Sequence, residues 1–298
     1  MYARPRYLDP TNDFTFKRVF RDKIRLIKFL NAIMRLSGER QIADLTYISQ
    51  EQVPELMHRK SSLVDIKCED KAGKVFIVEM QNGYQQYLLK RLQFYAANAY
   101  TSQLGAGDSY NDLMPVFVIV LLRDQIINPD IPIISYHKSR EETTGQHIFT
   151  DISHVIVELK KFTKTEDELS SEDDYWLYFL SKWAVSQGPP KRLQDEVIKT
   201  AYDQIEAFSF SEAEYKAYLD AKTLAEEELA NLEVEYKRGK TEGRAEGRAE
   251  GLAQRSLEFA QSMLADNEPI DKIKKWTGLS EEQINTLKEA EKVTFRPL

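Results

Sequence analysis

This chain has few of the side chains that build disulfides and zinc sites. Its 298 residues include one cysteine, Cys68, and four histidines. A single cysteine excludes an internal disulfide and a cysteine-based zinc cluster. None of the histidines is spaced as a helical ligand pair, so we expect no dedicated zinc site.

Long apolar runs are missing as well. The longest one, MPVFVIVLL at residues 114–122, is far too short to cross a bilayer as a helix. The first residues, MYARPRYLDP, contain no apolar run after their positive charges, so no signal peptide is predicted. We therefore expect a cytoplasmic protein that has no membrane partner.

The chain also lacks an overall excess of positive charge, since its net charge is −7. An acidic balance at first argues against a nucleic-acid partner. Residues 1–40, however, hold ten Lys or Arg against four Asp or Glu. Phosphate binding requires only a local basic face, so the net charge leaves a nucleic-acid partner open.

Apolar residues make up 42% of the chain, enough for a substantial core. Over residues 12–36 they recur at helical spacing and predict one amphipathic helix, with Asn12 or Asp13 as its N-cap. The other side of this helix carries a basic stripe of Lys17, Arg21, Arg25 and Lys28.

Residues 61–81 predict a β-hairpin, because two β-rich runs flank Asp70-Lys71-Ala72-Gly73. Gly73 suits the left-handed residue of a three-residue loop. The elements expected after the hairpin are a helix at 84–104, strands at 114–122, 131–138 and 154–161, and helices between 173 and 220. This order predicts an α/β core with a mixed sheet over residues 1–220.

The character of the chain changes near residue 221. Residues 221–255 predict a charged helix that runs into a repeat with glycine at 239, 243, 247 and 251. Because each glycine costs a helix about 1 kcal/mol, the repeat is either a frayed linker or a Gly/Ala stripe that pairs with a second chain. Residues 256–298 predict three short helices with a capping box at 280–283, a packing unit rather than a DNA reader. We expect a homodimer or a higher homo-oligomer through these C-terminal helices.

The hairpin places two carboxylates together. Asp65 lies opposite Glu79, and cross-strand partners approach to about 5 Å. Lys67 and Gln81 share the same face. Like charges directly opposite each other destabilise a sheet, and a divalent cation would compensate for them. Two solvated carboxylates paired with Lys67 or Arg91 are the alternative.

Asp65, followed after thirteen residues by Glu79-Met80-Gln81, resembles the PD-(D/E)XK nuclease pattern. The chain as a whole resembles the Rpn family, the recombination-promoting nucleases that are also classed as transposases. The strings that carry the resemblance cover most of the chain and are NDFTFKRVF (12–20), SLVDIKCEDKAGKVFIVEMQ (62–81), RLQFYAANAY (91–100), TSQLGAGDSYNDLMPVFVIVLL (101–122) and EGRAEGRAEG (242–251).

The resemblance implies a restriction-endonuclease-like core, a mixed β-sheet flanked by helices, with a helical C-terminal extension. It makes Asp65 and Glu79 the metal-binding carboxylates and the main-chain carbonyl of Met80 a further ligand. It makes Asp13 an additional acid from the first helix, although Asp13 acting only as a helix cap is equally open. The expected metal is Mg²⁺, with Mn²⁺ as a substitute.

Gln81 departs from the family pattern, which has lysine at that position. A neutral amide can donate a hydrogen bond but supplies no charge to stabilise developing negative charge. Lys67, on the same face as Asp65, and Lys17, on the first helix, are the candidate substitutes.

These features together predict an Mg²⁺-dependent DNA endonuclease linked to recombination or mobile elements. Lys17, Arg21, Arg25, Lys28 and Arg91 are expected to contact the phosphate backbone. The alternative is a non-catalytic DNA-binding or regulatory protein that retains the nuclease fold. A glycosidase with paired carboxylates is a third possibility with less support from the strings above.

Overall fold

The computed structural model describes residues 4–48, 51–52 and 62–294. The chain divides into two compact units, Met1–Leu229 and Ala230–Leu298. The first unit contains a sheet covered by helices on both faces, and the second is helical.

The described helices and strands are the following. The helices are α1 (Asp13–Phe20), α2 (Lys23–Ile33), α3 (Leu88–Thr101), α4 (Glu172–Lys182), α5 (Glu196–Ile205), α6 (Glu212–Ala265), α7 (Ile270–Thr277) and α8 (Glu281–Thr294). The strands are β1 (Leu45–Tyr47), β2 (Glu51–Gln52), β3 (Ser62–Leu63), β4 (Ile66–Asp70), β5 (Val75–Gln81), β6 (Val116–Leu122), β7 (Ile134–Lys138) and β8 (Ile152–Glu158).

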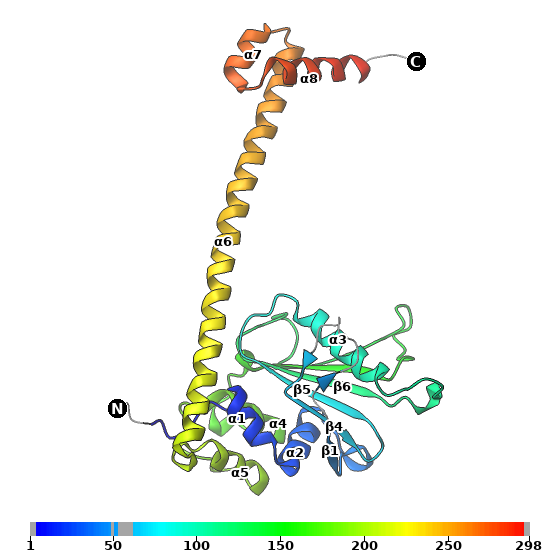
Figure 1. The fold of residues 1–298 in the computed structure, drawn as a ribbon, viewed down its shortest axis with the longest axis vertical. Helices are drawn as coiled ribbons and strands as arrows, with labels where there is room; N and C mark the ends of the chain where they lie inside the picture. The colour runs from blue at the N-terminus through cyan, green and yellow to red at the C-terminus, as the bar shows by residue number, and fades with distance from the viewer. Residues whose placement is uncertain (1–3, 49–50, 53–61, 295–298) are drawn as a thin grey trace. The chain divides into compact units, whose positions relative to one another are not determined.

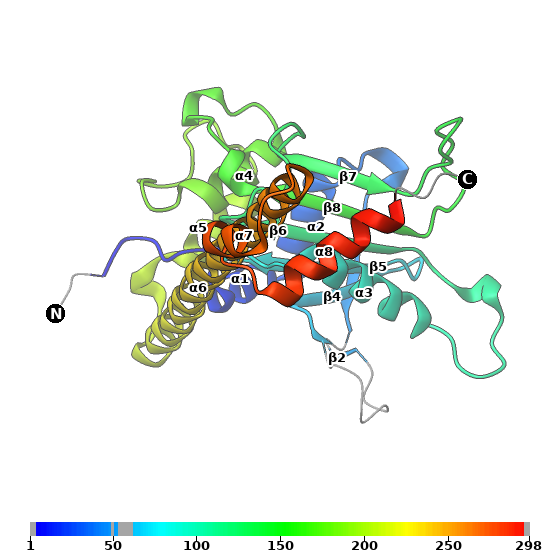
Figure 2. The same cartoon turned by 90° about the horizontal axis from the view of Figure 1, so that it is seen from above.

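The main sheet has the strand order β1-β4-β5-β6-β8-β7, and Figure 2 shows β4, β5, β6, β8 and β7 side by side. The pairs β5–β6 and β6–β8 are parallel, and the remaining pairs are antiparallel. The central strand β6 is apolar along its whole length, as expected for a parallel strand covered on both faces. The predicted α/β class with a mixed sheet is confirmed.

Helices cover both faces of this sheet, and each face has its own core (Figure 1). On one face α1, α2, α4 and α5 pack around Trp176, which is fully buried among Phe20, Phe29 and Phe179. On the other face, α3 packs against the sheet through Leu88 and the apolar residues that follow Leu88 in the helix. Aromatic pairs of this kind add to the free energy gained from burial.

The prediction of one helix over residues 12–36 is wrong. Asp22 interrupts it in an extended conformation and accepts hydrogen bonds from the backbone N–H of Ile24 and Arg25, as the N-cap of α2. Asn12, rather than Asp13, caps α1. The apolar spacing continues from α1 into α2 because both helices pack on the same core, so the spacing alone does not reveal the break.

The hairpin matches its predicted register. Ile66 pairs with Val78 and Cys68 with Phe76. Gly73 has φ +79°, and the Asp70 carboxylate accepts hydrogen bonds from the N–H groups of Ala72 and Lys74 at 2.9 Å. The turn therefore fixes which residues of β4 and β5 face each other.

The N-terminal segment is joined to the chain near residue 206. Leu8 N–H donates to the Ile205 carbonyl at 2.8 Å, and Ala207 N–H donates to the Arg6 carbonyl at 2.8 Å. These bonds hold the segment that leads into α1 against the end of α5.

The glycine repeat lies inside α6, so residues 221–255 are helical rather than frayed. In the second unit, Ala260, Met263, Ile273 and Ile284 form a small core. Ser280 and Gln283 make the predicted capping box, with bonds of 2.8 and 3.2 Å. Within the part of the chain that the structure describes, none of the helices has the length and apolarity needed to span a membrane.

Candidate active site

Two carboxylates lie together where β4 begins and β5 ends. Asp65 directly precedes β4, and Glu79 is on β5, with side chains 19% and 6% exposed. Met80 N–H donates to Asp65 Oδ2 at 2.7 Å, and Asp65 N–H donates to Glu79 Oε2 at 3.1 Å. Each carboxylate therefore has one oxygen held by backbone, and the predicted cross-strand pair is present.

The position of Asp65 follows from the hairpin register. The alternation of bonds along β4 and β5 directs the N–H and C=O of Met80 toward the β4 side. There the Asp65 carboxylate accepts the Met80 N–H. The Met80 carbonyl leaves the strand on this same side.

Burial shifts both acids toward their protonated forms, and a neighbouring carboxylate adds to the shift of each. Burial, followed by the charge of Asp65, raises the pKa of Glu79 to about 8. Burial also raises the pKa of Asp65, against the opposing effects of the Met80 N–H and Lys17. The protein alone does not neutralise this pair.

Two cations approach the pair from helices on opposite faces of the sheet. Lys17 Nζ on α1 lies 2.7 Å from Asp13 Oδ1 and 3.8 Å from Asp65 Oδ1. Arg91 Nη2 on α3 lies 3.6 Å from Glu79 Oε1. Burial tends to lower the pKa of Lys17, but the three nearby carboxylates raise it overall, which keeps this lysine charged.

Arg91 has capacity for a further ligand. Its Nη1 donates to Gln85 Oε1 at 3.4 Å, and its guanidinium lies 5.7 Å from the centre of the Tyr95 ring. Its Nε and Nη2 are buried without a hydrogen-bond acceptor among the described residues. Buried guanidinium donors of this kind are normally satisfied, and an anionic oxygen is the acceptor they suit best.

Gln81 serves the pair as a hydrogen-bond donor. Its Nε2 donates to Glu79 Oε1 at 3.0 Å. The amide therefore orients the Glu79 carboxylate, whereas a charge at this site has to come from Lys17 or Arg91.

Lys67 lies two residues further along β4 and is 9% exposed. Burial lowers its pKa, and the acidic group that counteracts this effect is Glu69. The charge of Lys17, by contrast, lowers the pKa of both Asp65 and Glu79. The structure therefore brings Lys17 to the pair, and the catalytic role expected for Lys67 stays a prediction.

The rest of the basic stripe is directed elsewhere. Arg25 Nε donates to the Val19 carbonyl at 2.8 Å, and Lys28 Nζ lies 2.7 Å from Asp195 before α5. Arg21 is exposed at the end of α1. Because the predicted helix is broken at Asp22, the four basic side chains do not form one continuous row beside the carboxylates.

Asp13 is 58% exposed and bound to Lys17, and its charge raises the pKa of Asp65. Among the described residues, no group of three Asp, Glu, His or Cys side chains is arranged to hold a metal ion. Two carboxylates and the Met80 carbonyl are thus the donors available, all of them oxygen. Oxygen donors and under-compensated negative charge fit Mg²⁺ or Mn²⁺.

A network that sequence reasoning missed holds α1 to the ends of β5 and β6. Arg123 Nη1 donates to the buried Asp9 Oδ2 at 2.6 Å, and Arg123 N–H donates to the Gln81 carbonyl at 2.9 Å. Asn82 Nδ2 donates to the Thr11 carbonyl at 2.6 Å. The sequence signal for this network is Arg123, a charged residue directly after the apolar strand β6. Its partner Asp9 could not be identified from the sequence, because it lies 114 residues away.

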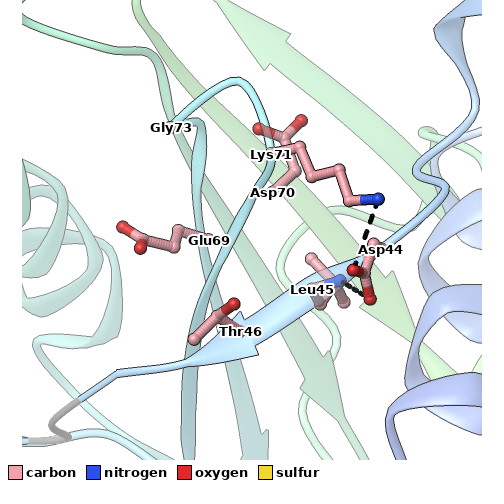
Figure 3. A pocket seen from close by; sticks show the side chains of 7 residues that line it. All are labelled: Asp44, Leu45, Thr46, Glu69, Asp70, Lys71 and Gly73. Atoms are coloured by element: carbon pink, nitrogen blue, oxygen red, sulfur yellow. Dashed lines mark hydrogen bonds and ion pairs between the residues drawn. The ribbon is translucent and has the colours of Figure 1, made fainter.

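A separate hollow of about 260 Å³ lies at the turn end of the hairpin (Figure 3). Asp44, Glu69, Asp70 and Lys71 are among its lining residues, and Lys71 Nζ lies 3.6 Å from Asp44 Oδ2. Because β4 runs from Asp65 to this turn, the hollow and the carboxylate pair lie at opposite ends of the strand.

Comparison with known families gives one finding. A family model described as PD-(D/E)XK nuclease family transposase matches residues 10–233. Neither the comparison with curated proteins nor the comparison with solved structures gives a match. The matched segment includes the carboxylate pair, Lys17, Gln81 and Arg91.

The raised pKa of Glu79 predicts an unusual dependence of stability on pH. The folded state holds this proton up to about pH 8, whereas the free side chain loses it near 4.5. The contribution to stability is therefore full below pH 4.5 and is lost as the pH rises through 8. We expect Glu79→Gln, measured by urea unfolding in EDTA, to be more stable than wild type by up to about 5 kcal/mol at pH 9 and nearly equal to it at pH 4.

The matched control for this experiment is Glu69→Gln, which changes a carboxyl of the same hairpin outside the pair. It should not reproduce the gain that grows with pH. A Glu79→Gln protein that is less stable than wild type at pH 9 would contradict the charge repulsion described above.

Proposed function

The chain belongs to the PD-(D/E)XK nuclease family transposases, and on that basis we propose that it is a metal-dependent DNA endonuclease centred on Asp65 and Glu79. The observation that carries this proposal is the carboxylate pair itself, in which buried Glu79 and half-buried Asp65 lie side by side and are oriented by backbone hydrogen bonds. Repulsion within such a pair lowers the stability of the metal-free protein. A bound cation would offset this repulsion, which is a reason to expect one. We place the activity in the cytoplasm, where DNA of mobile elements is accessible.

In this proposal Asp65, Glu79 and the Met80 carbonyl hold the metal, Mg²⁺ or in its place Mn²⁺. When bound, a divalent cation supplies Lewis-acid stabilisation of the phosphate charge and lowers the pKa of nearby water. The backbone bonds to Asp65 and Glu79 fix the carboxylates before the metal arrives, which reduces the reorganisation required on binding.

The side chains around the pair have separate roles in hydrolysis. A water oxygen joins phosphorus, one phosphorus–oxygen bond to a sugar breaks, and the departing oxygen gains a proton. Lys17, held between Asp13 and Asp65, stabilises the negative charge that develops on the phosphate and orients the water. Arg91 donates its free N–H groups to a phosphate oxygen, and Gln81 keeps Glu79 in place.

A non-catalytic DNA-binding or regulatory protein with the same fold is the second candidate. The observation that favours it is Gln81, which has the position of the motif's lysine and makes a neutral hydrogen bond to Glu79. The two candidates differ in cleavage and not in DNA binding, so one assay separates them.

Cleavage of supercoiled plasmid tests the proposal directly. We expect wild type to nick or linearise the plasmid with Mg²⁺ or Mn²⁺ and to be inactive in EDTA. Asp65→Asn should lower the rate at least about 100-fold, because it removes a charged ligand. Glu69→Gln should cut like wild type. If wild type binds the plasmid but never cuts it with either metal, the non-catalytic candidate is correct.

Lys17 and Lys67 can be distinguished by substitution. We expect Lys17→Ala to lower kcat about 100-fold with little change in KM, since its charge acts mainly in the transition state, and Lys17→Arg to recover part of the loss. Lys67→Met keeps the apolar stem of this buried side chain and should retain most of the activity. A large loss in Lys67→Met beside an active Lys17→Ala would assign the catalytic charge to Lys67.

We propose further that α6 pairs with α6 of a second copy, which would give two active sites for two DNA strands. Residues 239–251 are exposed, and four glycines in a row at one-turn spacing make an unsupported helix weak. Light scattering should find a dimer for wild type and Gly247→Ala and a monomer for Gly247→Leu, whose side chain prevents close approach. A monomeric wild type would exclude this pairing.

A further inference from the structure

The loop between β5 and α3, residues 82–87, is attached to the carboxylate pair at both ends. It follows Gln81, which binds Glu79, and it precedes Arg91, which lies one helical turn beyond Tyr87. Gln85 N–H donates to Gln125 Oε1 at 3.0 Å, and Asn82 is bound to the Thr11 carbonyl. The loop backbone is therefore anchored at several points.

Two large aromatic rings on this anchored loop are directed to solvent. Tyr84 is 60% exposed and Tyr87 is 65% exposed, whereas Tyr95 in the following helix is buried. A fixed backbone with exposed rings is a costly arrangement for a surface that binds nothing, since each ring offers a large apolar area. Successive bases of a single strand stack on aromatic side chains held in this way.

The distances along the chain match the spacing of nucleotides. Tyr84 is three residues from Gln81, at most about 11 Å between Cα atoms. Tyr87 is four residues from Arg91, about 6 Å along a helix. Stacked nucleotides of one strand repeat every 3.4 Å or so. A phosphate that accepts from Arg91 beside the carboxylate pair would thus have its neighbouring bases within one to three nucleotides of both rings.

The charge beside the rings also suits a nucleic-acid strand. Lys90 and Arg91 lie in the first turn of α3, after the loop, and Lys90 is exposed. Arg91 Nε and Nη2 have no hydrogen-bond acceptor among the described residues. Cationic donors for the backbone next to aromatic faces for the bases form the combination that recognises unpaired strands.

We propose that Tyr84 and Tyr87 form a stacking platform for an unpaired base next to the cleaved phosphate, so that the substrate is single-stranded or locally unpaired DNA. The inference rests on the proposed nuclease function. Bases within a duplex are covered by their neighbours and reach such rings only after they unstack. Tyr84 and Tyr87 therefore determine the preferred structure of the substrate and take no part in the chemical step.

The test uses full-length protein carrying Asp65→Asn, which cannot cleave. It is titrated into a 12-nucleotide single strand that contains 2-aminopurine at its centre, and into the same sequence as a duplex. We expect binding to quench the fluorescence of the single strand and to be weaker for the duplex. Tyr84→Ala and Tyr87→Ala should each raise Kd for the single strand about tenfold and remove much of the quenching.

The Phe variants at both positions should restore binding and quenching, because stacking needs the ring and not the hydroxyl. Tyr110→Ala is the control, since Tyr110 is 85% exposed but outside the loop. Equal Kd and quenching in the Ala variants would overturn the platform while leaving the nuclease function intact. Equal losses on single strand and duplex would overturn the preference for unpaired DNA. If the Asp65→Asn parent binds neither DNA, the proposed function itself fails.

Discussion

The repulsion between two carboxylates in one buried place is the constraint on which the rest of this site depends. Asp65 and Glu79 are brought together by hairpin register and are removed from water by the helices on both faces of the sheet. The protein answers with backbone N–H groups and with two cations at 3.6 and 3.8 Å. These distances are longer than direct hydrogen bonds, and under the proposed function a bound metal ion would add further positive charge beside the pair.

The hairpin could be predicted from sequence because its determinants are local. Gly73 sets the turn, the period-two pattern sets the faces, and the register then places Asp65 opposite Glu79. The mixed sheet also followed from the order of elements, since β5, β6 and β8 have clear apolar runs, whereas the short edge strand β1 was not predicted. These signals act over about twenty residues and need no knowledge of the fold.

The cationic side of the site could not be predicted in the same way. Lys67 shares a strand face with Asp65, yet Lys17 reaches the pair because α1 packs across the end of the sheet. The break at Asp22 was invisible in the apolar pattern, since α1 and α2 face the same core. Arg25 also donates to Thr200, and Lys28 pairs with Asp195, contacts to the chain beyond residue 190 that no local pattern reports.

The attachment of the N-terminal segment to residues 205–207 has a consequence for the order of assembly. The hairpin with its two acids is complete once about eighty residues exist, whereas α1 is fixed only when α5 has been made. Closing so long a loop is slow compared with forming a hairpin. During synthesis the acids therefore precede Lys17 at the site by more than a hundred residues. A chain interrupted before α5 therefore carries the two acids without the lysine that pairs with them in the complete fold.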